Sequence, residues 1–470
     1  MNAAAAVAAP TTPRAPARRR TELGLIVLAV LLVGGLYAIA GLGKAGSLPA
    51  NIVPFLLIFF ALLVVAHVAM RYLAPNADPI LLPTAGLLNG VGYTFIARLS
   101  SSQASKQAAW TALGFLVFIA TLAVVRRGRD LERYRYLFAF AGIGLLLLPL
   151  VPHIGENING ARLWIHLGSF SFQPGELAKL ALAVFFASVL VERADLLAHG
   201  TVRIGRFLVL DPRYLAPIIV AWGLSLLIFL AENDLGSSFL FFALFIGMLW
   251  MATGRAYYLG LGVGLFAAGA VFALKVIGHA QSRVQAWLDP WAHPETTGYQ
   301  IIQGQFAIAD GSVFGTGPGQ SNASHIPYAS SDFIFAVVAN ELGLVGAAAL
   351  LMGYLLMVGT GLRIALRADR QFEKLLAAGL ALILGVQTFV IVGGVTRLIP
   401  LTGITLPFVS YGGSSLIANW ILVAVLLRIS DDTETPMVVR PSSLVELSDV
   451  GLDTGMIDLG TPTPPESGVS

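Results

Sequence analysis

The sequence predicts an all-α polytopic membrane protein with about twelve transmembrane helices. Its 470 residues are 56% hydrophobic and only 12% charged, whereas a soluble domain carries about 25% charged residues. So much apolar surface does not fit inside a water-soluble core. Apolar stretches of roughly 20 residues, the length that crosses a bilayer, also recur along the whole chain. Both observations indicate a bundle of helices in lipid.

The expected spans follow one another through short polar connections, with one long exception. Candidate spans lie at residues 22–42, 51–72, 79–97, 107–125, 136–152, 175–192, 214–232, 235–253, 257–278, 332–361, 375–397 and 405–428. Residues 1–20 are rich in Ala, Pro and Arg, and no Ala-x-Ala-like cleavage site follows the first apolar run. We therefore expect a disordered N-terminal segment at 1–20 and a transmembrane domain over 21–430.

Positive charge alternates between successive connections and predicts the orientation. Arginines gather in every second connection, for example at 126–135 and 363–374, and the others hold scattered charges. Because Lys- and Arg-rich connections stay in the cytoplasm, we expect a multi-pass protein of the cytoplasmic membrane with both termini inside. Residues 279–331, before the tenth span, then lie outside the cytoplasm. The polar 431–470 tail lacks apolar content and is expected to be disordered and cytoplasmic.

The long outer connection at 279–331 leads to the candidate catalytic residue, Asp332. This connection is polar, aromatic and rich in Gly and Pro, and we expect it to be an irregular loop. Structureless connections of this length are usually functional. Asp332 opens an apolar helix, so it suits a helix cap. An ionisable group at the edge of the hydrocarbon is also costly and tends to be functional.

A second polar group surrounds the start of the helix at Pro174. Glu176 and Lys179 are three residues apart, so they share one helix face. They form either a local ion pair or the polar lining of a cavity that opens outward. Arg162 lies in the outer connection before this helix.

Three further charged residues stand at or near outer ends of spans. Asp234 occupies a tight turn, either as a turn former or as a second carboxylate near the site. Arg397 begins a Gly- and Pro-broken connection whose irregular backbone must be buried or line a cavity. Its planar guanidinium suits an anionic phosphate. Glu341, inside the helix after Asp332, should face the bundle and find a partner, because an unpaired glutamate there is costly.

Several other classes of site are excluded. The chain has no cysteine, which rules out disulfides, thiolate metal sites and cysteine nucleophiles. The net charge is only +3 and the arginines serve topology, so no nucleic acid partner is expected. The seven histidines lack metal-ligand spacing. GTGPGQ at 315–320 follows no predicted strand and opens no long helix, so we do not interpret it as a phosphate loop.

Five stretches together resemble the SEDS family (shape, elongation, division and sporulation), the RodA/FtsW proteins of bacterial cell-wall synthesis. In chain order, within residues 80–430, they read RLWIHLGSFSFQPGELAK, NDLGSS, RVQAWLDPWAHPETTGYQIIQGQFAIADGSVFGTGPGQ, SSDFIFAVVANELGLVG and RLIPLTGITLPFVSYGGSS. The chain is most similar to the RodA proteins of actinobacteria. The resemblance implies a ten-helix core, to which the first two spans are added.

The resemblance also implies a peptidoglycan glycosyltransferase that polymerises lipid II at the outer membrane face during elongation and shape maintenance. Lipid II is a disaccharide-pentapeptide on undecaprenyl pyrophosphate. The family pattern places the essential aspartate at Asp332. It assigns substrate-binding positions to Arg162, Glu176, Lys179, Asp234 and Arg397. It implies a class B penicillin-binding protein as partner. The sequence departs from the pattern at Gly175, Asn340 and 231–233.

On this interpretation, Asp332 acts as general base on the 4-hydroxyl of an acceptor GlcNAc. The leaving pyrophosphate would be stabilised by Arg162, Lys179 or Arg397. No cofactor is assigned, and a divalent cation, Mg²⁺ or Mn²⁺, would suit the pyrophosphate. Two alternatives remain. One is a lipid II flippase, and the other is a division-specific, FtsW-type polymerase or scaffold for a class B penicillin-binding protein.

Overall fold

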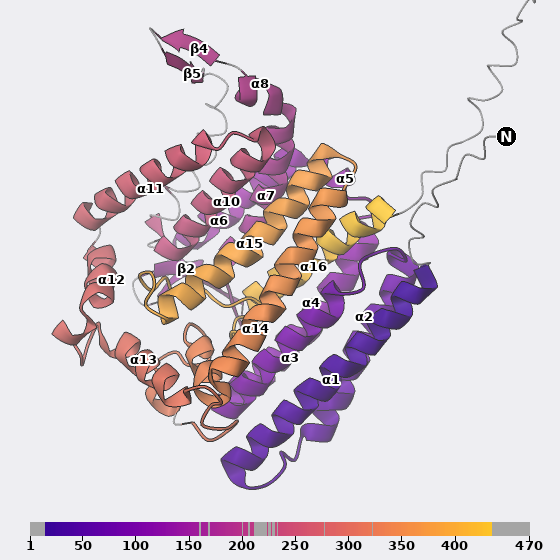
Figure 1. The fold of residues 1–470 in the computed structure, drawn as a ribbon, viewed down its shortest axis with the longest axis vertical. Coiled ribbons are helices and arrows are strands. Elements are labelled where there is room, and N and C mark those ends of the chain that lie inside the picture. The colour runs from indigo at the N-terminus through magenta and orange to yellow at the C-terminus, as the bar shows by residue number, and fades with distance from the viewer. Residues whose placement is uncertain are drawn as a thin grey trace, which may run out of the picture. The chain divides into compact units, whose positions relative to one another are not determined.

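The computed structural model is a helical bundle, as expected. It describes residues 15–434 apart from 159–160, 168–169, 200, 205–206, 211–222, 224–226, 228–230, 233, 277 and 322. Eight helices in this part of the chain are long and apolar enough to cross a membrane (Figure 1). They are α1 (Ala15–Ala45), α2 (Ile52–Leu73), α4 (Ser101–Val124), α7 (Pro174–Glu192), α10 (Leu235–Thr253), α14 (Ile334–Arg367), α15 (Gln371–Val395) and α16 (Gly413–Glu434).

Three further helices coincide with expected spans but are shorter or less apolar. They are α3 (Leu81–Leu99), α6 (Arg135–Leu147) and α11 (Tyr257–Val276). Short helices α5 (Asp130–Arg133) and α8 (Ala194–His199) occupy connections. The expected span at 214–232 lies almost entirely outside the described residues, and 1–14 and 435–470 lie wholly outside them. Residues 15–20, expected to be disordered, belong to α1. Because α16 continues to Glu434, the helical domain extends past the expected boundary at 430.

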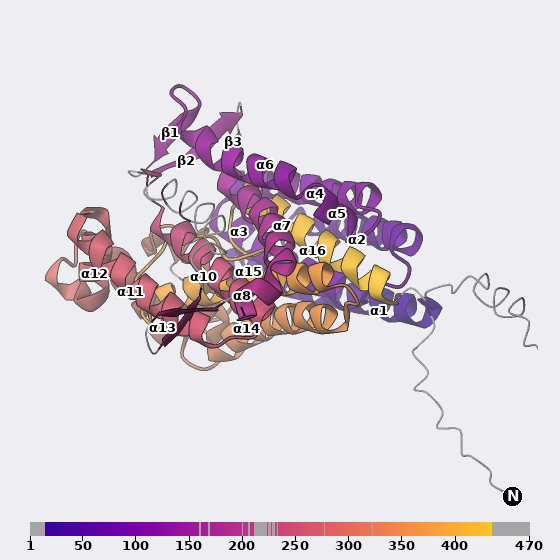
Figure 2. The same ribbon diagram turned by 90° about the horizontal axis from the view of Figure 1, so that it is seen from above.

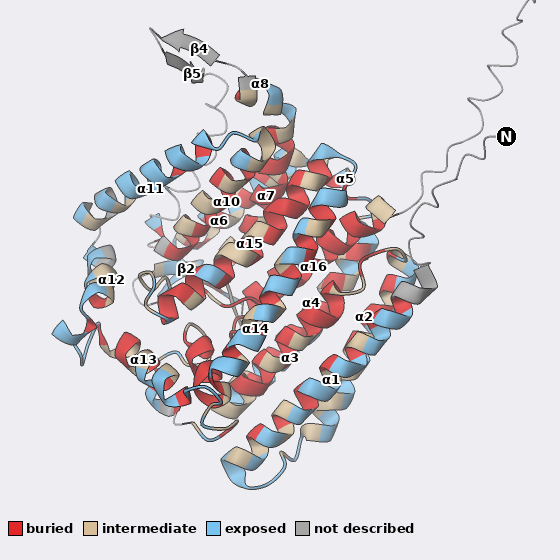
Figure 3. Cartoon of the chain, in the orientation of Figure 1, coloured by how far each residue is buried: buried red, intermediate tan, exposed pale blue. Residues whose placement is uncertain are grey.

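The bundle has a buried centre made by α16, α7 and α15. In the most apolar windows of these helices, 94%, 78% and 72% of the residues are buried, against 22% for α2 and 33% for α1 (Figure 3). Trp420 of α16 packs against Phe115 and Phe118 of α4. The outward faces of α1 and α2 carry exposed apolar side chains such as Leu57, as expected for helices that meet lipid.

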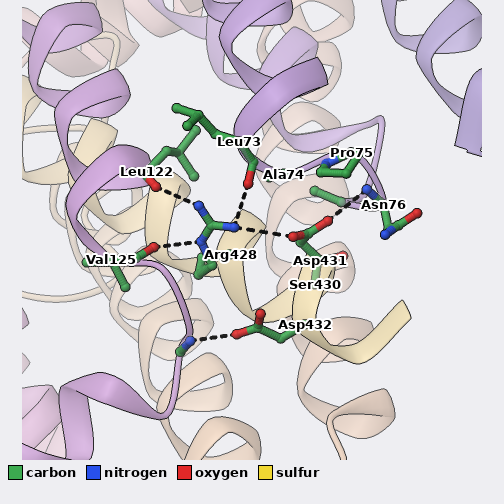
Figure 4. A network of polar contacts seen from close by, with 12 residues as sticks. Leu73, Ala74, Pro75, Asn76, Leu122, Val125, Arg428, Ser430, Asp431 and Asp432 are labelled. Carbon is green, nitrogen blue, oxygen red and sulfur yellow. Dashed lines mark hydrogen bonds and ion pairs between the residues drawn. The ribbon is translucent and has the colours of Figure 1, made fainter. Parts of the chain in front are cut away.

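The last turns of α16 fasten two connections to the bundle (Figure 4). Arg428 donates hydrogen bonds of 2.5–2.7 Å to the carbonyl oxygens of Leu73, Leu122 and Val125. Asp431 and Asp432 accept backbone N–H groups from Asn76 and Gly128. The three carbonyl groups that Arg428 binds lie at the C-terminal ends of α2 and α4, where no helical N–H remains to bind them. One arginine therefore satisfies the ends of two neighbouring helices.

The expected irregular loop at 279–331 is wrong in part, because much of it is helical. It contains α12 (Gly278–Leu288), α13 (Tyr299–Gly311) and two single 3-10 turns, η2 (Pro290–Ala292) and η3 (Ala323–His325). α13 buries Ile301, Ile302 and Ala307 and packs on α14. These helices are too short to be stable alone. Packing against the bundle stabilises them despite the Gly- and Pro-rich flanks.

Two small antiparallel sheets, which the sequence did not suggest, lie in connections. Strands β1 (Gly155–Ile158), β2 (Ala161–Leu167) and β3 (Phe170–Phe172) form one sheet in that order. This sheet follows α6 and the 3-10 turn η1 (Leu148–Leu150) (Figure 2). β4 (Thr201–Ile204) pairs with β5 (Phe207–Leu210).

α14 is interrupted at Gly343. This residue has φ +67° and ψ −167°, a conformation that L side chains rarely adopt. A Cβ there would also lie only 2.3 Å from the backbone nitrogen of Gly315. Beyond the break, Leu344 N–H donates to the Ser312 carbonyl at 3.0 Å. The break separates a short first segment, which follows Asp332, from the long remainder of the helix.

Candidate functional site

Asp332 lies in a turn before α14 and is partly exposed. The helix cap is Phe333, with no side-chain cap bond, so capping does not explain Asp332. The Phe333 N–H donates to the Tyr328 carbonyl at 3.2 Å and closes the turn. The Ser410 hydroxyl donates to the Ser331 carbonyl at 2.6 Å. The turn is thereby fixed to the segment that precedes α16.

The side chains of Arg283, in α12, and Asp332 both lie beside Gly403. A Cβ placed on Gly403 would lie 3.4 Å from Nη2 of Arg283 and 3.6 Å from Oδ2 of Asp332. Arg283 Nη1 donates to the carbonyl oxygens of Leu401 (3.1 Å) and Thr402 (2.6 Å). Gly403 has φ +76°, so the backbone bends where the two charged groups converge. Backbone carbonyls thus hold a guanidinium in the immediate surroundings of the carboxylate.

The surroundings of Asp332 shift its pKa upward. The partial burial of Asp332 raises its pKa to about 6; the Arg283 guanidinium and the Ser331 hydroxyl oppose this rise, and the Asp234 charge adds to it. The group is therefore mostly ionised at neutral pH, yet it is more basic than an ordinary surface aspartate. This combination suits a general base, whose pKa should lie near the working pH.

Asp234 is both a helix cap and a neighbour of the site. Its Oδ1 accepts the Ser237 N–H at 3.0 Å, and the Ser237 hydroxyl donates to Oδ2. Burial raises the pKa of Asp234; the Ser237 hydrogen bonds and the Arg283 charge oppose the rise, and the Glu176 charge adds to it. Asp234 therefore caps α10, and its charge also acts on Asp332. Its role in substrate binding stays a prediction.

Glu176 and Lys179 form the expected ion pair on one face of α7. Lys179 Nζ lies 2.8 Å from Glu176 Oε2, and each side chain is only 5% exposed. Lys179 also donates to Gln387 Oε1 at 3.1 Å, and Gln387 Nε2 donates to the Thr405 carbonyl at 2.8 Å. This chain of contacts links α7 through α15 to the segment that carries Gly403.

The structure places Arg397 on the end of α12. Its Nε and Nη2 donate to the carbonyl oxygens of Trp287 and Leu288, each at 2.7 Å. The Trp287 indole N–H donates back to the Arg397 carbonyl at 3.0 Å. Arg397 therefore closes the C-terminal end of the helix that carries Arg283, one turn away. Direct contact between Arg397 and substrate stays a prediction.

Arg162 lies in β2, and its backbone N–H donates to the Glu232 carbonyl at 3.1 Å. This contact joins the small sheet to the connection before Asp234. A role for the Arg162 side chain in substrate binding stays a prediction.

Glu341 has the partners that the sequence analysis expected. It is fully buried, and its Oε1 lies 2.6 Å from Nε of Arg98 in α3. Its carboxylate also accepts the Gly319 N–H and the Ser321 hydroxyl, each at 2.7 Å. The outer loop is therefore fastened to the helix that follows Asp332.

Reasoning from the sequence missed Arg283, Gln387 and Gly403. Arg283 lies in the outer connection at 279–331, and nothing in RVQAWLD alone shows what its guanidinium faces. Gln387 lies inside an apolar span, where a polar side chain usually faces a cavity or a partner. That signal was available. Gly403 would have been found only by asking which glycine needs a positive φ.

The described residues contain no group of three or more His, Asp or Glu side chains that could hold a metal ion. Beside Asp332 the positive charge comes from Arg283 instead. A divalent cation at this site stays a prediction, and we derive no catalytic step from one.

Comparison with known proteins identifies the family. The model of the cell cycle protein family of FtsW, RodA and SpoVE matches residues 91–435. The chain belongs to this family. A Mycobacterium tuberculosis protein named peptidoglycan glycosyltransferase RodA is 40% identical to this chain over 453 residues. The match covers 94% of this chain and 97% of that protein. A probable peptidoglycan glycosyltransferase FtsW of Geobacter sulfurreducens is 35% identical, and the match covers 75% of this chain and 95% of that protein.

Solved structures of the family agree with the fold. A chain from a peptidoglycan synthase complex superposes with a TM-score of 0.63 at 29% identity, covering 76% of this chain and 98% of that one. RodA of Thermus thermophilus gives a TM-score of 0.56 at 28% identity, and the superposition covers 78% of this chain and 100% of that one. The family match begins inside α3. This start is consistent with α1 and α2 being additions to the shared family core.

Proposed function

We propose that this protein is a peptidoglycan glycosyltransferase that polymerises lipid II during cell elongation. Its relatives in the RodA and FtsW groups are named for peptidoglycan glycosyl transfer. The RodA relative covers 94% of this chain, whereas the FtsW relative covers 75%, which favours the elongation role over division. The observation that carries the proposal is the Asp332 carboxylate, held in a pinned turn beside Arg283.

The proposed reaction is a single displacement at the anomeric carbon of the donor sugar. Asp332 takes the proton from the 4-hydroxyl of the acceptor GlcNAc. The resulting oxygen forms the new glycosidic bond, and the bond from the anomeric carbon to the pyrophosphate oxygen breaks. Arg162, Lys179 or Arg397 is the proposed contact for the departing charge, and Arg283 adds a nearby cation. A single displacement inverts the configuration, from an α-linked donor to a β-linked product.

The rate should depend on the protonation of Asp332. Only the ionised carboxylate accepts a proton, so kcat/KM should fall as the pH drops below about 6, by about tenfold per pH unit well below that value. Initial rates of lipid II polymerisation between pH 5 and 8 measure this profile. A rate that is unchanged from pH 7 to pH 5, in protein that stays folded, would contradict the role of Asp332.

A detergent assay separates the polymerase from a lipid II flippase. Micelles have no second leaflet, so a flippase has no transport to perform there. We expect purified protein with lipid II in detergent to form glycan polymers of several disaccharides. If lipid II stays monomeric under these conditions but crosses the bilayer when the same protein is in vesicles, the flippase explanation is correct.

The remaining elements of the proposal concern partners and orientation. One solved relative comes from a peptidoglycan synthase complex, which supports a class B penicillin-binding protein as partner. The alternation of arginines supports insertion in the cytoplasmic membrane, with both termini inside and Asp332 at the outer face. A divalent cation, Mg²⁺ or Mn²⁺, would arrive with the pyrophosphate, since Mg²⁺ commonly binds through substrate phosphates.

A further inference from the structure

A pocket opens sideways between α2 and α4, away from the site at Asp332. Its volume is about 220 Å³. Ile58 of α2, 62% exposed, and Ala108 of α4, also exposed, stand at its rim. Phe59 of α2 and Asn89 of α3 are buried at its floor. Because α2 precedes the family match at 91–435, one wall of this pocket lies outside the matched region.

Two polar side chains at the floor lack partners. Asn89 is fully buried and Thr111 is 5% exposed. Within the described part of the chain, neither the amide nitrogen and oxygen of Asn89 nor the Thr111 hydroxyl makes a hydrogen bond. Both residues line the pocket. Buried polar groups are nearly always paired, so these atoms indicate that something else completes the pocket.

The depth of these groups decides what kind of molecule can pair with them. Asn89 lies about ten residues from the end of α3, and Thr111 lies about ten residues from the start of α4. At 1.5 Å per residue, each lies about 15 Å from the outer ends of these helices. The hydrocarbon layer is about 30 Å thick, so both groups are near its middle. Lipids offer only hydrocarbon there, whereas a protein helix carries polar side chains at any depth.

The exposed face of α4 beside the pocket suits close packing of another helix. Ser105, Ala108 and Ala112 are exposed and recur at intervals of three and four residues. Small residues at this spacing let two transmembrane helices approach closely. The pocket exceeds the roughly 150 Å³ that admits a benzene ring, but it is below the range of about 300–1,000 Å³ typical of small-molecule sites. It therefore fits one inserted side chain.

We propose that a transmembrane helix of another membrane protein docks between α2 and α4 and inserts a polar side chain into this pocket. The inserted residue is Asn, Gln, Ser or Thr, because it must pair with the Asn89 amide and the Thr111 hydroxyl without bringing a charge into the membrane. The partner packs over Ser105, Ala108 and Ala112. This surface is independent of the chemistry at Asp332.

Model helices of defined sequence test the proposal with the full chain in phosphatidylcholine vesicles. The chain has no cysteine, so a Ser101→Cys substitution at the exposed outer end of α4 gives a single attachment site for a fluorescent donor. The probes are two acceptor-labelled polyleucine transmembrane peptides, one with a central Asn and one without. From the strength of interhelical hydrogen bonds, the Asn peptide should associate about three- to thirtyfold more tightly.

Substitutions in the chain then test whether the preference for the Asn peptide arises at this pocket. Ala108→Trp fills the pocket from its exposed rim, so it should abolish the preference for the Asn peptide while the protein folds normally. Asn89→Leu should do the same. The matched control is Ser188→Ala, which removes another buried hydroxyl without a partner among the described residues, from α7 and outside the pocket. This control should leave the preference unchanged.

Three outcomes would overturn the proposal. The two peptides could bind the unmodified chain equally, as they would if lipid chains fill the pocket. The Asn preference could persist in Ala108→Trp, which would place the peptide elsewhere. Finally, donor- and acceptor-labelled copies of the chain could associate without peptide and separate on Ala108→Trp, which would make a second copy the occupant.

Discussion

Asp332→Asn is expected to lower the rate of lipid II polymerisation by about 10²- to 10⁴-fold, the usual contribution of a general base. The amide has nearly the same shape as the carboxylate but does not accept a proton at neutral pH. The pinned turn does not use the Asp332 side chain in its backbone contacts, so the protein should still fold. Glycan formed from lipid II by the purified variant measures the effect.

A matched variant makes this result specific. Asp310→Asn introduces the same change at an exposed aspartate on α13 and should keep the rate within about twofold, as expected for a surface position without a special role. If Asp332→Asn polymerises as fast as Asp310→Asn, Asp332 is not the base. If cells grow normally with Asp332→Asn alone, the protein acts as a scaffold.

Glu176→Ala is expected to destabilise the protein by about 3–5 kcal/mol, because it leaves the Lys179 ammonium buried without its counter-ion. The pair is only 5% exposed, so water cannot replace the lost carboxylate. Thermal unfolding of the purified protein in a fixed detergent should show a lower midpoint. Polymerisation should fall as well, since the same pair connects α7 to the segment carrying Gly403.

Helix α7 supplies its own control for this measurement. Glu192 pairs with Arg135, but its side chain is 55% exposed, and exposed ion pairs contribute only about 0–1 kcal/mol. Glu192→Ala should therefore shift the midpoint much less. A double variant, Glu176→Leu with Lys179→Met, should recover much of the stability, because it removes both buried charges. Equal effects of the two single alanine variants would show that the buried pair is not structurally important.

Sequence patterns predicted the helical spans well because lipid imposes a simple requirement on length and polarity. They placed Glu176 and Lys179 on one helix face for a similar reason, since helical spacing fixes which side chains are neighbours, but they left open whether the two side chains form a pair or line a cavity. Helices α12 and α13 were missed because short helices depend on tertiary packing, and their Gly- and Pro-rich flanks indicated a loop.

The candidate site could be predicted only in part. Asp332 was found because a carboxylate at the edge of an apolar span is costly. Its relation to Arg283 depends on how α12 packs, which no local pattern reveals. The residue type of Arg397 suggested a phosphate contact, which stays a prediction, but it did not reveal that the guanidinium also binds the Trp287 and Leu288 carbonyls. Residue type indicates what a side chain can bind, whereas the fold decides which group it meets.

The break at Gly343 has a mechanical consequence for the reactive turn. Helices tilt when the hydrocarbon around them becomes thicker or thinner, and an uninterrupted α14 would carry such a tilt straight to its first residue. The break at Gly343, with φ +67°, interrupts the helix directly after its short first segment. That segment is separately anchored by Glu341 to Arg98 of α3. The position of the turn that carries Asp332 therefore depends on α3 and the outer loop as well as on the long remainder of α14.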